Sequence, residues 1–80
     1  MEEVGKVFTY FSKAGAAGIK LTGTLAVGDT IRIKGATTDF EQKVESMQIE
    51  RTPIQKAESG ASVGIKVKER VRPNDVVYKV

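Results

Sequence analysis

Four basic side chains at alternate positions form the most prominent candidate binding surface of the sequence: Lys66, Lys68, Arg70 and Arg72. On a continuous strand this spacing places them on one face, in a row ~20 Å long. Such a row suits a phosphate backbone, because each phosphate contact releases a condensed counterion. A solubilising strand face and a charged, aggregation-resistant edge remain open as alternatives. Glu69 interrupts the opposite apolar face, so a bend there would scatter the row.

A second candidate surface lies near the start of the chain, where Phe8, Tyr10 and Phe11 stand between Lys6 and Lys13. Exposed rings beside cations can stack on nucleic-acid bases. The rings occupy both parities of a strand, so we expect at least one outside, although a small core draws most of them inward. We take Tyr10, Phe11 and Lys13, together with the four basic residues, as RNA-binding candidates.

The usual catalytic side chains are missing, because the sequence contains neither histidine nor cysteine. This removes the commonest general base, the common nucleophile systems and the commonest zinc ligands. Ser59 and Ser62 could pair with Lys66, but nothing in the pattern indicates a pocket that would desolvate the amine. Neighbouring carboxylates such as Asp39 and Glu41 are interpreted as solvated surface groups. We therefore expect no enzyme activity, no catalytic residue, no cofactor and no metal site.

A nucleotide-binding loop is also not expected. The phosphate loop has the pattern G-x-x-x-x-G-K-[ST]. The nearest stretch, residues 60–66, has too few residues between its glycines and has Ile65 where lysine should follow. It also lies in strand-like sequence. We predict that this chain alone does not bind GTP.

The elements that position these residues are predicted from alternation with period two, which is typical of strands buried on one face. It appears in residues 19–27, 30–34 and 62–68. Gly28-Asp29 predicts a hairpin turn between two adjacent antiparallel strands, and residues 73–75 predict another turn. The expected buried residues are Ile19, Leu21, Leu25, Ile31, Ile33, Val63, Ile65 and Val67.

Residues 40–50 fit two structures. Phe40, Val44 and Met47 have helical spacing, preceded by a candidate capping box at residues 38–41. A strand requires a change of face near residues 45–46, which a bulge can supply. In either case, proline in Thr52-Pro53 is expected to end the segment.

Composition favours one soluble globular domain covering residues 1–80. Hydrophobic residues are 40% of the chain and charged residues 29%, an ordinary globular balance. The net charge of +3 suits an anionic partner. No apolar run approaches the ~20 residues that span a bilayer, and the acidic start is unlike a secretory signal. We expect a cytoplasmic protein without membrane association.

Two ordered motifs resemble a known family. Residues 23–33 resemble the signature G-x-[IVL]-x-x-G-D-x-[IV]-x-[IV] of the second domain of translational GTPases, such as elongation factor Tu and initiation factor two. Residues 57–67 resemble the companion pattern A-x-x-G-x-x-[VA]-[GA]-[IVL]-x-[IVL] of the same domain. Between the two motifs, residues 44–49 resemble a strand of that family.

The resemblance implies an all-β fold, a closed antiparallel barrel of six or seven strands, with residues 40–50 as strand. In that family the barrel follows a GTPase domain, which is missing here, and helps to hold aminoacyl-tRNA or to contact the ribosome. No binding residue can be carried over from it. Short elongation-factor-like proteins are a closer match, and a similar barrel is appended to some collagenase-like peptidases.

Two functional hypotheses follow. The first is a non-catalytic, translation-associated module that binds RNA, tRNA or the ribosome surface. The alternative is a protein-interaction module that docks to a separate enzyme, such as a collagenase-like peptidase or an RNA-modifying enzyme, through an exposed strand edge.

Overall fold

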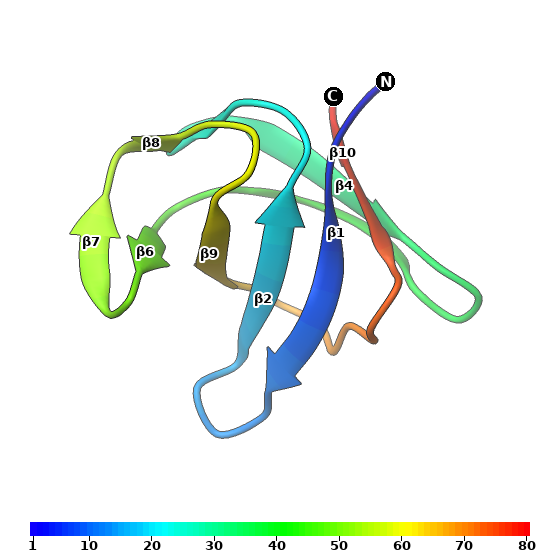
Figure 1. The fold of residues 1–80 in the computed structure, drawn as a ribbon. Coiled ribbons are helices and arrows are strands. Elements are labelled where there is room, and N and C mark those ends of the chain that lie inside the picture. Colours follow the sequence, from blue (N-terminus) through cyan, green and yellow to red (C-terminus); the bar gives the residue numbers. More distant parts are fainter.

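The computed structural model describes all 80 residues and contains strands but no helix (Figure 1). The strands are β1 (Glu2–Phe11), β2 (Ala16–Leu21), β3 (Leu25–Ala26), β4 (Thr30–Lys34), β5 (Asp39–Lys43), β6 (Met47–Ile49), β7 (Thr52–Ile54), β8 (Lys56–Ala57), β9 (Ser62–Lys66) and β10 (Val76–Lys79). All strand pairs are antiparallel, so the predicted all-β antiparallel fold is confirmed. No helix is available that could cross a membrane.

Eight strands form one curled sheet in the order β5-β4-β10-β1-β2-β9-β6-β7, and β3 pairs separately with β8 (Figure 1). The sheet has more strands than the six or seven expected, because the β6–β7 hairpin extends it beyond β9. Its end strands β5 and β7 do not pair, so the predicted closed barrel is not confirmed. The two ends of the chain lie side by side, since Glu2 is paired with Lys79.

One core of 17 buried apolar residues fills the concave side of the sheet, and all eight residues expected there are buried. The core is almost entirely aliphatic, and Phe40 is its one aromatic member. The expectation that most rings near the start lie inside is wrong, because Phe8 and Phe11 are 51% and 53% exposed. Val4 and Val7 already occupy the inward positions of β1, and the β1–β2 register shifts between Val7 and Thr9, which redirects the side chains that follow.

The Gly28-Asp29 turn is present but does not form the predicted hairpin. Gly28 has φ +100°, which favours glycine, and the Asp29 carboxylate accepts the Ala26 N–H at 2.9 Å. However, β3 pairs with β8, whereas β4 pairs with β10 and β5. The turn therefore leads from the small sheet to the large one, and the alternating residues 19–27 form two strands with a bend between them.

Residues 40–50 are strand, in two pieces. The pairing breaks at residues 44–46, around the expected bulge, and the chain moves from β5 beside β4 to β6 beside β9. Phe40, Val44 and Met47 are all buried. Pro53 does not end the segment, because it lies within β7, an edge strand in which a missing N–H donor is tolerated.

Candidate functional site

The floor of a groove is formed by small residues on the outer face of β2 and β9. The two strands pair with Ala16 opposite Lys66 and with Gly18 opposite Gly64. Because side chains alternate along a strand, the core residues of both strands point to the other face. The outward positions carry Ala16, Gly18 and Lys20 on β2, and Ser62, Gly64 and Lys66 on β9. Lys20, opposite Ser62, is outside the groove lining. Between Lys20 and Lys66, the outer face of this strand pair carries only small residues.

The two paired glycines have different effects on the floor. A Cβ on Gly18 would lie 2.9 Å from Cζ of Phe8, so glycine allows that ring to lie close against β2. A Cβ on Gly64 would meet no atom within 4 Å. The space above Gly64 is therefore open, and the Phe8 ring borders it.

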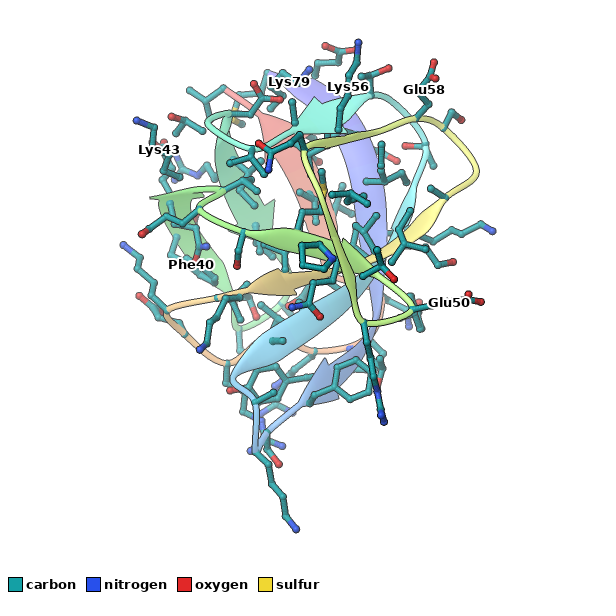
Figure 2. All side chains as sticks on the ribbon, turned by 90° about the vertical axis from the view of Figure 1, so that its left-hand side faces the viewer. Phe40, Lys43, Glu50, Lys56, Glu58 and Lys79 are labelled. Atoms are coloured by element: carbon teal, nitrogen blue, oxygen red, sulfur yellow. The ribbon has the colours of Figure 1, made fainter.

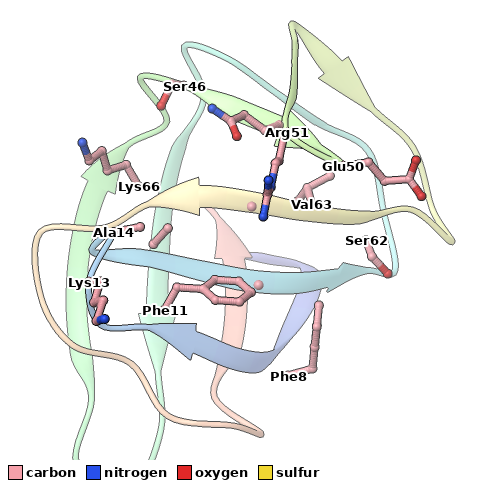
Figure 3. A pocket seen from close by; sticks show the side chains of 14 residues that line it. Phe8, Phe11, Lys13, Ala14, Ser46, Glu50, Arg51, Ser62, Val63 and Lys66 are labelled. Atoms are coloured by element: carbon pink, nitrogen blue, oxygen red, sulfur yellow. The ribbon is translucent and has the colours of Figure 1, made fainter.

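The walls of the groove come from the strands on either side. Phe8 and Phe11 extend from β1, and Gln48, Glu50 and Arg51 belong to the β6–β7 hairpin. Figure 3 shows Arg51 reaching across β9 toward the Phe11 ring, while Glu50 points to the side. Figure 2 shows the hairpin from its outer side, with Glu50 at the turn. This open groove, the β2/β9 groove, has a volume of about 910 Å³.

The turn that carries Arg51 has a strained backbone. Glu50 and Arg51 have φ values of +49° and +68°, and they are the two residues that connect the paired residues Ile49 and Thr52. Two-residue hairpin turns with two positive φ values favour Asn-Gly, because a side chain in the left-handed region costs about 1–2 kcal/mol per residue. The structure thus holds two unfavourable residues at the place where Arg51 extends over the groove.

The groove is positively charged. Lys13, Arg51 and Lys66 line it, against the single acid Glu50. None of these four side chains forms an ion pair, because the ion pairs of the structure join Arg32 to Asp39 and Glu41, and Lys79 to Asp29. The three cations are therefore available to a bound anion.

Of the seven predicted site residues, the structure brings Phe11, Lys13 and Lys66 together in the β2/β9 groove. The straight row of basic residues, which required a continuous strand, does not form, because β9 ends at Lys66. Gln42 of β5 donates to the Lys66 carbonyl and accepts the Lys68 N–H, both at 2.8 Å, in place of a neighbouring strand. Beyond this point Val67 and Val71 turn inward and are buried.

The remaining predicted site residues lie outside the groove lining. The Lys68 ammonium lies 5.9 Å from the Phe40 ring centroid, and the Arg70 guanidinium 5.7 Å from that of Tyr10, within reach of a cation–π attraction. Arg72 donates its backbone N–H to the Asp75 carboxylate at 2.9 Å. Lys66 and Lys68 also border a second hollow of about 390 Å³.

Sequence reasoning missed the residues that give the groove its shape. Gly18 and Gly64 each carried a signal, since an isolated glycine within a strand pattern often marks a close approach to the backbone. Arg51 carried none, because its position over β9 depends on how the β6–β7 hairpin is placed. Phe8 was considered as a ring that could stack but was left out of the site residues.

A separate ion pair lies on the outer face of β4 and β5. Arg32 donates two hydrogen bonds to Asp39, at 2.8 and 3.1 Å, and one to Glu41 at 3.3 Å. The hydrogen bond from Arg32 lowers the pKa of Asp39 below its usual value, and the hydrogen bond to Asp39 raises the pKa of Arg32. No cluster of three histidine, cysteine or acidic side chains that could hold a metal is present.

Sequence comparison relates the chain to proteins named as proteases. No family model matches it. It is 44% identical over 78 residues to a collagenase of Porphyromonas gingivalis, covering 95% of this chain and 22% of that protein. It is 42% identical over 77 residues to an uncharacterized protease of Methanocaldococcus jannaschii, covering 19% of that protein. The chain thus spans about a fifth of the length of these relatives.

Two solved structures that share this fold are of the same domain of one protein. The selenomethionine variant of the C-terminal domain of a putative U32 peptidase from Geobacillus thermoleovorans superimposes with a TM-score of 0.94 at 24% identity, covering 99% of this chain and 100% of that one. A second structure of that domain gives a TM-score of 0.92, with 92% of its chain covered. The likeness establishes the fold.

These comparisons correct the predicted membership of the translation-factor family. The matched proteins are named as a collagenase, a protease and a U32 peptidase, and none of them points to a translation factor. The signature at residues 23–33 has a local explanation, since Gly28 and Asp29 shape a turn and Ile31 and Ile33 point into the core. It therefore describes a path of the backbone rather than a function. The predictions of a translation role and of RNA binding are corrected with it.

Proposed function

We propose that this chain is a non-catalytic module of a peptidase-type protein and that it binds a ligand for that protein in the β2/β9 groove. The observation that carries the proposal is the 44% identity over 78 residues to a protein named collagenase, of which the match makes up only 22%. The fold shared with the C-terminal domain of a putative U32 peptidase supports it. This was the alternative hypothesis from the sequence.

The residue types of the groove favour binding over bond cleavage. Its lining combines half-exposed rings, a bare floor and three cations. Such a surface offers apolar contact and charge pairing, which are the components of a recognition site. We propose that residues 1–80 act as one unit around their single core.

A chimera tests the proposal. In the Porphyromonas gingivalis relative, the matched 78-residue segment is deleted in one variant and replaced by this chain in another. Hydrolysis of denatured collagen is then measured for both variants, for the parent and for the isolated chain. We expect the deletion to raise KM, the chimera to restore it, and the isolated chain to hydrolyse nothing.

A short soluble peptide substrate is the control, because its turnover depends on the catalytic region and should be the same in all three long proteins. A chimera no better than the deletion variant would overturn the proposed role as a module. Hydrolysis by the isolated chain would overturn its non-catalytic character.

We further propose that the six strands β5-β4-β10-β1-β2-β9 act as a closed barrel, with the β6–β7 hairpin outside the closure. The support is Gln42, whose side chain joins edge strand β5 to the end of β9 through two hydrogen bonds of 2.8 Å. Because β9 is also half of the groove floor, this closure would keep the floor rigid.

A further inference from the structure

We infer that the β2/β9 groove binds an extended acidic peptide that also carries a bulky apolar side chain. The inference deepens the proposed function and rests on it for the polypeptide nature of the ligand. It assigns three roles to the groove: the floor receives the backbone, the rings receive an apolar side chain, and the cations receive carboxylates.

The floor has the dimensions of one extended chain. It is two strands wide and lies between walls on β1 and β6, which are three strand spacings, or about 14 Å, apart. It follows the length of β9, Ser62–Lys66, so four or five extended ligand residues at ~3.3 Å each can lie along it. With no side chain on Gly64 and no atom within 4 Å of where its Cβ would be, a peptide backbone can approach closely above it, beside the Phe8 ring that covers Gly18.

The rings of Phe8 and Phe11 provide the apolar contact. Each is about half exposed, at 51% and 53%, and both lie on the same wall (Figure 3). Covering this apolar surface with a leucine or phenylalanine side chain removes it from water, which drives association. A wholly hydrophilic peptide lacks this contact.

The cations select acidic side chains. Lys13, Arg51 and Lys66 have no ion-pair partner in the structure. The Arg51 guanidinium lies over the floor (Figure 3), and its planar fork can hold a carboxylate through two parallel hydrogen bonds. The pairing of β6 with β7 and with β9 places the turn that carries Arg51 beside the floor.

A nucleic-acid strand fits the groove less well. Such a ligand needs a basic track along its phosphates. The cations that could extend the track beyond Lys66 do not line the groove, because Lys68 and Arg70 lie against aromatic rings. Glu50 adds a negative charge at the hairpin wall.

The test is titration of the ¹⁵N-labelled chain with the peptide acetyl-Leu-Asp-Phe-Asp-Leu-amide, followed by NMR, and calorimetry for the Kd. The matched peptide has asparagine in place of each aspartate. We expect the amide signals of Gly18, Arg51 and Gly64 to shift, and the asparagine peptide to bind at least about tenfold more weakly, because it lacks the charge-assisted hydrogen bonds.

Two variants locate the site. Gly64→Val places a side chain in open space above the floor, so it should leave the fold intact and weaken binding at least about tenfold, since a filled floor excludes the ligand backbone. Thr30→Val is the control, because it adds an exposed valine to β4, outside the groove. Arg51→Gln should weaken binding, whereas Lys56→Gln should not, because it makes the same change of charge on β8, at the top of Figure 2 and outside the groove lining.

The inference is overturned by equal affinity for the two peptides, by unchanged binding in Gly64→Val, or by a single-stranded oligouridylate that binds the groove more tightly than the acidic peptide. Its failure is separable from that of the proposed function. If the chimera restores KM but the chain binds no peptide, the acidic-peptide inference fails and the proposed function as a module stands. If the chain binds the peptide but the chimera does not restore KM, the inferred ligand stands and the proposed function as a module fails.

Discussion

The side chain of Gln42 stands in for a strand beside Lys68. Its Oε1 accepts the Lys68 N–H at 2.8 Å, and its Nε2 donates to the Lys66 carbonyl at 2.8 Å. A single carboxamide thus makes the pair of hydrogen bonds that a neighbouring backbone would make. It ends the regular part of β9 and joins the segment that follows to edge strand β5.

Loss of this bridge should destabilise the protein. Gln42→Leu removes two hydrogen bonds, each with a net value of roughly 0.5–1.5 kcal/mol, and both are exposed to water. We expect the free energy of unfolding, measured by urea denaturation, to fall by about 1–2 kcal/mol. Gln55→Leu is the control: Gln55 is exposed and only its backbone is hydrogen-bonded, so its substitution should change stability by less than about 0.5 kcal/mol. Equal effects of the two substitutions would refute the bridge.

The strained turn at Glu50 and Arg51 predicts opposite effects on stability and binding. Replacing both residues by Asn-Gly should raise the free energy of unfolding by about 1 kcal/mol, because these residues accept positive φ with little strain. Binding of the acidic peptide should weaken, because Arg51 is lost. Arg51→Gln alone should weaken binding of the acidic peptide but should not raise the free energy of unfolding, since the backbone of the turn stays strained. A double variant that is no more stable than the parent would show that the turn stores no strain.

The carboxylate of Asp75 should hold the segment between β9 and β10 in place. It is 4% exposed and accepts the Arg72 N–H at 2.9 Å. Asp75→Ala leaves that donor without its partner, so we expect a loss of about 1–3 kcal/mol in the free energy of unfolding. Asp75→Asn keeps an acceptor oxygen and should lose less. Thermal unfolding of the two variants checks this, and we expect the lower midpoint for Asp75→Ala. Equal midpoints for Asp75→Ala and Asp75→Asn would contradict the prediction.

The carboxylate of Asp39 makes the stability of the folded protein depend on pH, and the sign of this dependence follows from its lowered pKa. The hydrogen bond from Arg32 lowers its pKa in the folded protein, so the unfolded chain binds this proton more readily. Its contribution to stability is therefore present above the ordinary pKa of about 3.9 and is lost as the pH falls through the lowered value. Carboxyl ¹³C NMR should show Asp39 titrating below its usual range. Arg32→Gln should move this titration to higher pH, and Lys56→Gln should not. Because the pair is exposed, the effect on stability should be small.

The sequence predicted which residues of a strand are buried, because local backbone geometry determines this. Alternation identified Ile31, Ile33 and Ile65 as buried, because the period of two follows from the strand backbone alone. It could not identify partners: Leu25 pairs with Ala57, far along the chain, rather than with the strand after its own turn. The groove was missed for the same reason. Its floor and its Arg51 wall come from β2, β9 and the β6–β7 hairpin, which meet only through long-range pairing.

The exposed ring of Phe11 supplies the last prediction, which separates a ligand contact from a core residue. Because 53% of Phe11 is exposed, Phe11→Ser should lower the free energy of unfolding by about 1 kcal/mol at most. Ile65, by contrast, is 0% exposed, and Ile65→Asp should abolish folding, because a buried unpaired charge is strongly unfavourable.

Binding should respond in the opposite way to stability. Phe11→Ser removes apolar surface from the groove wall. It should raise the Kd of the acidic peptide about tenfold, which corresponds to about 1.4 kcal/mol of binding free energy. Val80→Ser is the matched control, since Val80 is 60% exposed and lies outside the groove lining, and its Kd should stay that of the parent. Circular dichroism shows whether each variant is folded, and calorimetry gives the Kd. A folded Phe11→Ser variant with unchanged affinity would mean that this ring, although exposed, is not where the ligand makes its apolar contact.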